Sequence, residues 1–73
     1  MRRYEFDLCI PADELLRYYR GSAASVQAID RYGRRLRFPA AALRPFVSGG
    51  GVRGTFVMVV GEDNRLKELA RVR

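Results

Sequence analysis

The sequence predicts a small α+β domain, in which a curved, mainly antiparallel sheet of about five strands carries one helix over its apolar face. Three observations predict this class: the apolar–polar alternation of residues 3–10, the helix signals that directly follow Pro11, and the β-prone segments that flank short turns farther along. The expected order is strand, helix, strand, strand, turn, strand, strand, and glycines at positions 51 and 54 would let the sheet curl into a partial barrel. We expect one domain, residues 1–73, with a thin core, because a chain of this size buries only about 60% of its unfolded surface.

The first strand is predicted by a period of two over residues 3–10. Glu5, Asp7 and Cys9 share one face, and the apolar residues share the other: Tyr4, Phe6, Leu8 and Ile10. A strand with one polar face is typical of an antiparallel sheet that is covered on one side.

The helix is predicted over residues 12–20. It follows Pro11, and Asp13 and Glu14 complement the positive end of the helix dipole. Four apolar residues recur at helical spacing and are expected to form one stripe: Leu15, Leu16, Tyr18 and Tyr19. Gly21 is well placed for a left-handed cap.

A hairpin is predicted next, with strands over residues 24–30 and 34–38. The turn at residues 31–33 contains Gly33, which is free to take positive φ. In the second strand, Leu36 and Phe38 are expected inward, and Arg35 and Arg37 outward.

The C-terminal half is predicted to hold two more strands. Pro45 limits residues 40–47 to about one helical turn, and residues 48–51 form a glycine-rich connection. Residues 52–60 are the most β-prone stretch. Residues 65–72 have apolar residues at helical spacing, but the turn before them favours a final strand.

Most chemistry is excluded by composition. The chain has no His and one Cys, so disulfide scaffolds, zinc sites and His-based catalysis are not expected. The carboxylate pairs at residues 13–14 and 62–63 fit a helix start and a turn, and the glycine-rich residues 48–54 lack the ending of a phosphate-binding loop. We predict no enzyme, no catalytic residue, no cofactor and no metal.

The compartment is expected to be the cytoplasm. No signal-peptide core follows Arg2 and Arg3, and the charge-free residues 54–61 are far short of the ~20 residues of a transmembrane helix. The single Cys9 agrees with a reducing environment.

The charge distribution is the most informative feature of the sequence. The chain carries 14 basic and eight acidic residues, a net charge of +6, and Lys67 is the one basic residue that is not Arg. Residues 1–30 and 62–73 nearly balance, so the excess lies in residues 31–61, which contain no acid and six arginines: Arg31, Arg34, Arg35, Arg37, Arg44 and Arg53.

These arginines predict a nucleic-acid interface. If the third and fourth strands are neighbours, Arg35, Arg37 and Arg53 form one patch, which the turn extends with Tyr32 at its edge. Such a patch is typical of proteins that follow a phosphate backbone, since arginine offers forked donors and stacks on bases. The expected partner is RNA or DNA, or else an acidic protein; a membrane is not expected, because the one helix is short and begins with acids.

The alternative is a protein-interaction or structural module. Arg-rich usage also follows from genome base composition, and an outward strand face must carry polar residues. Leu43, Phe46 and Val47 would then present an apolar anchor or, more simply, close one end of the core. Self-association through an exposed terminal strand also stays open.

Several segments together resemble a known family. They are Tyr18-Tyr19-x-Gly21-Ser22-Ala23, Gly33-Arg34-Arg35-x-x-Phe38-Pro39-Ala40, Leu43-Arg44-Pro45-Phe46-Val47 and Gly51-Val52-x-Gly54-x-Phe56. In this order they resemble the DUF2835 family, small bacterial proteins of unknown function. The resemblance covers nearly the whole chain and implies an independent α+β domain. It supplies no catalytic or binding residues.

Overall fold

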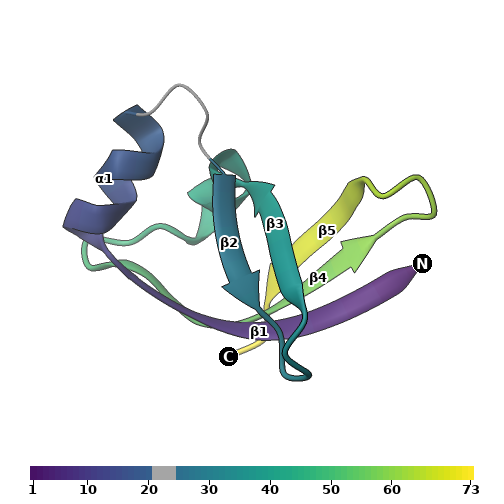
Figure 1. Cartoon of the computed structure of the whole chain (residues 1–73). Coiled ribbons are helices and arrows are strands. Elements are labelled where there is room, and N and C mark those ends of the chain that lie inside the picture. The colour runs from purple at the N-terminus through teal and green to yellow at the C-terminus, as the bar shows by residue number, and fades with distance from the viewer. Residues whose placement is uncertain (21–24) are drawn as a thin grey trace.

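The structure is a computed structural model that describes residues 1–20 and 25–73, with the backbone alone for residues 18–20. Its elements are β1 (Arg2–Pro11), α1 (Ala12–Arg20), β2 (Ser25–Ile29), β3 (Arg35–Pro39), the 3-10 helix η1 (Ala40–Phe46), β4 (Gly51–Val60) and β5 (Leu66–Arg71) (Figure 1). The predicted α+β class and element order are confirmed, and residues 66–71 are a strand.

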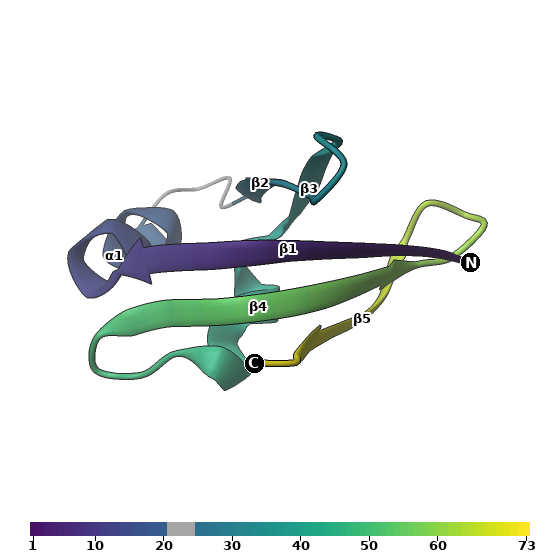
Figure 2. The same cartoon turned by 90° about the horizontal axis from the view of Figure 1, so that it is seen from below.

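The strands form two antiparallel sheets, not the single curved sheet that was expected. One has the order β1-β4-β5, and the other is the β2-β3 hairpin. β1 and β4 pair along their whole length, from Arg2 opposite Val60 to Pro11 opposite Gly51. Figure 2 shows these two long strands side by side, with β5 next to β4 and the hairpin on the other side of β1. The two sheets do not close into a barrel.

The core lies between the inner face of the larger sheet and the hairpin. The alternation of β1 is confirmed, since Phe6, Leu8 and Ile10 are buried and the residues between them are more exposed. Phe6 contacts Phe38 of β3 at 5.7 Å between ring centroids and Phe56 of β4 at 6.2 Å. This one side chain therefore joins both sheets.

Helix α1 places one of its two leucines in the core. Leu15 is buried but Leu16 is half exposed, so the two do not share one buried stripe. The hairpin and η1 also cover the apolar face, through residues such as Val26 and Leu43. The predicted roles of the Tyr18 and Tyr19 side chains, of the Gly21 cap and of position 24 fall outside the described residues.

The segment after β3 also differs in detail from the prediction. Residues 40–46 form a 3-10 helix that runs through Pro45, longer than the one turn expected. A proline ring fixes φ near −65°, which suits a 3-10 helix, and costs one backbone hydrogen bond. The N–H of Val47 closes the last turn by donating to the Arg44 carbonyl at 3.3 Å.

Gly51 sets how closely β4 approaches β1. Its φ is 107°, and an added Cβ would lie 2.0 Å from the carbonyl oxygen of Ile10. The two-residue turn before it closes with reciprocal backbone hydrogen bonds between Ser48 and Gly51, of 2.9 and 3.0 Å. Only glycine fits this conformation and this space.

Candidate nucleic-acid interface

The turn of the hairpin is organised by Asp30. Its Oδ1 accepts the backbone N–H groups of Tyr32 at 3.0 Å and of Arg34 at 2.8 Å. Gly33 takes the predicted positive φ, 81°, and donates its N–H to the Asp30 carbonyl at 3.1 Å. An aspartate that accepts N–H groups two and four residues later stabilises a turn, and Asp30 therefore fixes how β2 leads into β3.

The Asp30 carboxylate stays ionised although its side chain is almost fully buried. Burial alone would raise its pKa, but hydrogen bonds from the Arg34 N–H, the Arg34 guanidinium and the Tyr32 N–H, together with the Arg34 charge, lower the pKa below its ordinary value. The guanidinium Nε lies 2.6 Å from Oδ2. Asp30 and Arg34 thus form a neutral pair within the turn.

Arg34 is also flanked by two aromatic rings. Its guanidinium carbon lies 4.6 Å from the ring centroid of Tyr4 and 5.3 Å from that of Tyr32. Tyr32 is 84% exposed, whereas Tyr4 is half-buried on β1. These cation–π contacts join the turn to β1, so Arg34 has a structural role in addition to the phosphate contact that was predicted for it.

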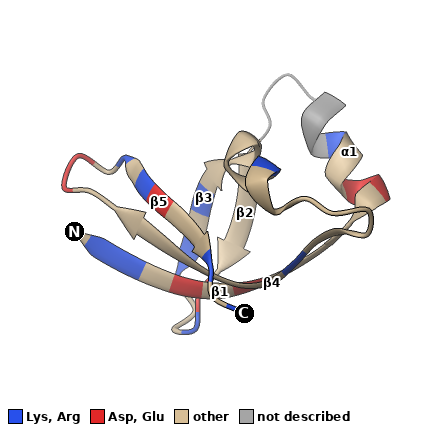
Figure 3. Cartoon of the chain, turned by 180° about the vertical axis from the view of Figure 1, so that it is seen from behind, with Lys and Arg blue, Asp and Glu red and all other residues tan. Residues whose placement is uncertain are grey.

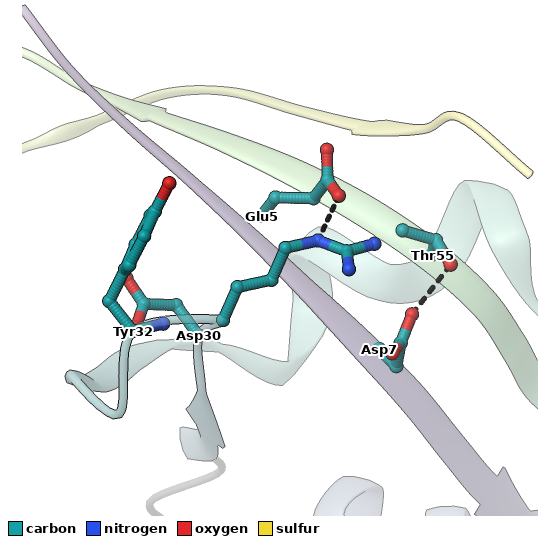
Figure 4. Close-up of polar contacts among 6 residues, drawn as sticks. Glu5, Asp7, Asp30, Tyr32 and Thr55 are labelled. Carbon is teal, nitrogen blue, oxygen red and sulfur yellow. Dashed lines mark hydrogen bonds and ion pairs between the residues drawn. The ribbon is translucent and has the colours of Figure 1, made fainter.

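Arg31 likewise joins the turn to β1. Its backbone N–H donates to the Glu5 carbonyl at 3.1 Å, and its guanidinium forms an ion pair with the Glu5 carboxylate. Figure 4 shows Glu5 on β1 close to the turn that carries Asp30 and Tyr32. Two of the six arginines in residues 31–61 are therefore compensated by carboxylates.

Arg35 and Arg37 lie on the outward face of the hairpin, as predicted. Cross-strand pairing places Ile29 opposite Arg35 and Gln27 opposite Arg37, and all four residues are exposed. Within residues 1–20 and 25–73, no carboxylate forms an ion pair with either arginine. Figure 3 shows the basic bands on β3 beside an uncoloured β2.

A groove of about 680 Å³ runs along this face. It is lined by Asp7, Gln27, Ala28, Ile29, Arg35, Leu36 and Arg37. Ile29 is 65% exposed and contributes an apolar surface opposite Arg35. The groove therefore combines two cations, one anion, one amide and an apolar patch.

Asp7, on β1, is the residue of the larger sheet that lines this groove. One of its carboxylate oxygens, Oδ1, accepts the hydroxyl proton of Thr55 at 2.6 Å (Figure 4). Thr55 faces it directly across the β1–β4 pair. The hydrogen bond holds the carboxylate in one orientation and leaves Oδ2 without a partner among the residues that the structure describes.

The single patch expected from Arg35, Arg37 and Arg53 does not form. β3 pairs with β2, whereas β4 pairs with β1 and β5, so Arg53 belongs to the other sheet. Arg53 lies opposite Cys9 and does not line the groove. Arg44 is exposed on η1 and is also outside the groove.

The predicted apolar anchor is divided between core and surface. Leu43 is fully buried, and Phe46 is half-buried with its ring edge-on to Phe56 at 5.2 Å between centroids. Val47 is 42% exposed. Leu43 and Phe46 thus close one end of the core, which was the simpler of the two interpretations.

Two features of the candidate site were not predicted from the sequence. One is the turn-stabilising role of Asp30, which an Asp before Arg-Tyr-Gly does signal. The position of Asp7 beside Arg35 and Arg37 had no local signal, because it depends on how the two sheets pack.

The described residues contain no group of three or more His, Cys, Asp and Glu side chains that could hold a metal ion. Among the helices of residues 1–20 and 25–73, none is long and apolar enough to span a membrane.

Comparison with known proteins identifies the family. No curated protein and no solved structure matches the chain. Residues 2–72 match the family model described as "Protein of unknown function (DUF2835)". That match spans almost all of the 73 residues, and the chain therefore belongs to the DUF2835 family.

Proposed function

We propose that this protein is a small, non-enzymatic, cytoplasmic module that binds nucleic acid through the outward face of the β2-β3 hairpin. The observation that carries the proposal is the pair Arg35 and Arg37, exposed side by side in the groove with no carboxylate paired to either within residues 1–20 and 25–73. Both guanidinium groups are available for a ligand.

The spacing of the pair supports a phosphate backbone as that ligand. Alternate residues of a strand lie about 6.7 Å apart, a distance that suits adjacent phosphates of an extended nucleic-acid chain. Arginine binds phosphate through two parallel hydrogen bonds, which gives orientation as well as attraction.

The charge of the whole chain supports the same ligand. A net charge of +6 on 73 residues attracts any polyanion at long range. The ion pairs of Arg31 with Glu5 and of Arg34 with Asp30 make these two arginines less available to a ligand than Arg35 and Arg37. Arg35 and Arg37 lie together in the groove and form no ion pair within residues 1–20 and 25–73.

The test is a fluorescence polarisation titration of labelled single-stranded RNA, single-stranded DNA and duplex DNA at several salt concentrations. We expect binding that weakens with salt. The double variant Arg35→Ala, Arg37→Ala should bind all sequences more weakly and lower the salt slope by about 1.4 for single strands, or about 1.8 for duplex.

A matched control distinguishes binding through the groove from attraction by the total charge of the protein. The double variant Arg17→Ala, Arg65→Ala removes the same charge from α1 and from the β4–β5 turn, outside the groove. It should retain most of the affinity. Equal losses in the two double variants, or no binding of the wild type at low salt, would contradict the proposal.

A further inference from the structure

We propose that the groove binds single-stranded nucleic acid and that Asp7 reads the hydrogen-bond donors of an unpaired base, with guanine as the preferred base. This inference rests on the proposed function and assigns a specificity-determining residue to the same site. The juxtaposition that carries it is Asp7 of β1 in one groove with Arg35 and Arg37 of β3, with no ion pair between them.

A carboxylate in this position disfavours the binding of a ligand that offers only phosphate groups. Ionised aspartate has only acceptor sites, so it repels phosphate oxygens and requires donors. A ligand that satisfies the whole groove must therefore carry anionic groups for the arginines and N–H groups for Asp7. A nucleotide strand with its bases unpaired meets both requirements.

The hydrogen bond from Thr55 prepares Asp7 for this role. It uses one acceptor site of Oδ1, at 2.6 Å, and holds the carboxylate plane, so that Oδ2 and the second site of Oδ1 can together accept two adjacent donors. Guanine offers two adjacent donors, N1–H and the 2-amino group, on its Watson–Crick edge. Uracil and adenine each offer a single donor group there, and cytosine offers only its 4-amino group.

The remaining groove residues fit a base and not a base pair. Ile29, 65% exposed, gives an apolar surface for the flat face of a ring, and the amide of Gln27 can donate or accept at a base edge. Single-stranded bases are typically recognised in this way, splayed from the strand with their Watson–Crick edges exposed. In a duplex those edges are occupied by the partner strand.

The experiment compares two labelled RNA strands of about eight nucleotides, rich in uridine, that carry either guanosine or inosine at the same positions. Inosine lacks only the 2-amino group. Wild-type protein should bind the guanosine strand at least about fivefold more tightly. It should bind the corresponding duplex more weakly than the single strand.

Three variants isolate the contribution of Asp7. Asp7→Asn keeps the side-chain shape and removes the negative charge, so affinity for both strands should rise while the preference for guanosine falls below about twofold. Glu68→Gln, the same charge change at an exposed site outside the groove, should leave the preference intact. Thr55→Val keeps the Asp7 charge and frees its carboxylate, and should lower the preference without raising affinity.

The outcomes separate this inference from the proposed function. If wild-type protein binds both strands equally and Asp7→Asn only raises both affinities, the base-reading role is wrong and phosphate binding stands. Tighter binding of duplex than of single strand also overturns the inference alone. If neither strand binds at low salt, the proposed function fails, and this inference with it.

Discussion

Replacement of Phe6 by alanine should separate the two sheets. Phe6 is 1% exposed and is the side chain whose ring contacts both Phe38 of the hairpin and Phe56 of the larger sheet. Truncation of a buried phenylalanine to alanine typically costs about 3–5 kcal/mol. A domain of 73 residues has a total free energy of unfolding of about 4–11 kcal/mol, so Phe6→Ala should lose from about a quarter to all of that stability.

The effect should extend from the core to the groove. Asp7 follows Phe6 in β1, and Arg37 precedes Phe38 in β3, so the contact between the two rings sets the distance between the groove walls. Phe6→Leu should remain folded at a cost of about 1–1.5 kcal/mol, and its midpoint of thermal unfolding should fall by about 4–8 °C for each kcal/mol.

Urea unfolding followed by circular dichroism measures these differences. Leu16→Ala is the matched control, because Leu16 is half exposed on α1 and its truncation should change stability by no more than about 0.5 kcal/mol. If Phe6→Ala lies within about 1 kcal/mol of the wild type, Phe6 does not hold the sheets together and the packing described above is wrong.

Two further predictions concern the turn and the β1–β4 contact. The pKa of Asp30 is lowered in the folded protein, so its ionised form stabilises the fold above its unfolded pKa, and this contribution is lost as pH falls through the folded pKa. Urea unfolding at neutral pH and at pH below about 4 should therefore show a smaller loss on acidification for Asp30→Asn than for the wild type; an equal loss would contradict the role of Asp30. Gly51→Ala should cost more than about 1 kcal/mol, because its Cβ would lie 2.0 Å from the Ile10 carbonyl oxygen and its φ is positive. Gly49→Ala, where the added Cβ meets nothing, should stay within about 0.5 kcal/mol of the wild type, and equal effects of the two substitutions would refute the close approach.

Local patterns predicted much of the fold. The alternation of β1 placed Phe6 inward and Asp7 outward, and the same period placed Arg35 and Arg37 on the outer face of β3. The helix bounds were correct because Pro11 and the acidic residues after it are local signals. These features depend on residues close together in the chain.

Features that depend on distant residues were not predictable in the same way. The turn at residues 31–33 predicted β3 beside β2, but no local pattern shows whether the other edge of β3 pairs with β4. It does not, and Arg53 therefore lies apart from Arg35 and Arg37. The composition shows the excess positive charge of residues 31–61, but not which arginines have an acidic partner. The ion pair of Arg31 with Glu5 spans 26 positions of sequence and has no local signal. The candidate interface is consequently smaller than the arginine count suggested and contains an acid.

The decisive measurement is where on the protein single-stranded RNA binds. A titration of isotope-labelled wild-type protein with single-stranded RNA, followed by backbone amide chemical shifts, reports every contacted segment at once. We expect the largest shifts at Asp7, at residues 27–29 and at residues 35–37. Shifts that cluster at η1 or in the β4–β5 turn, with the hairpin unchanged, would contradict it.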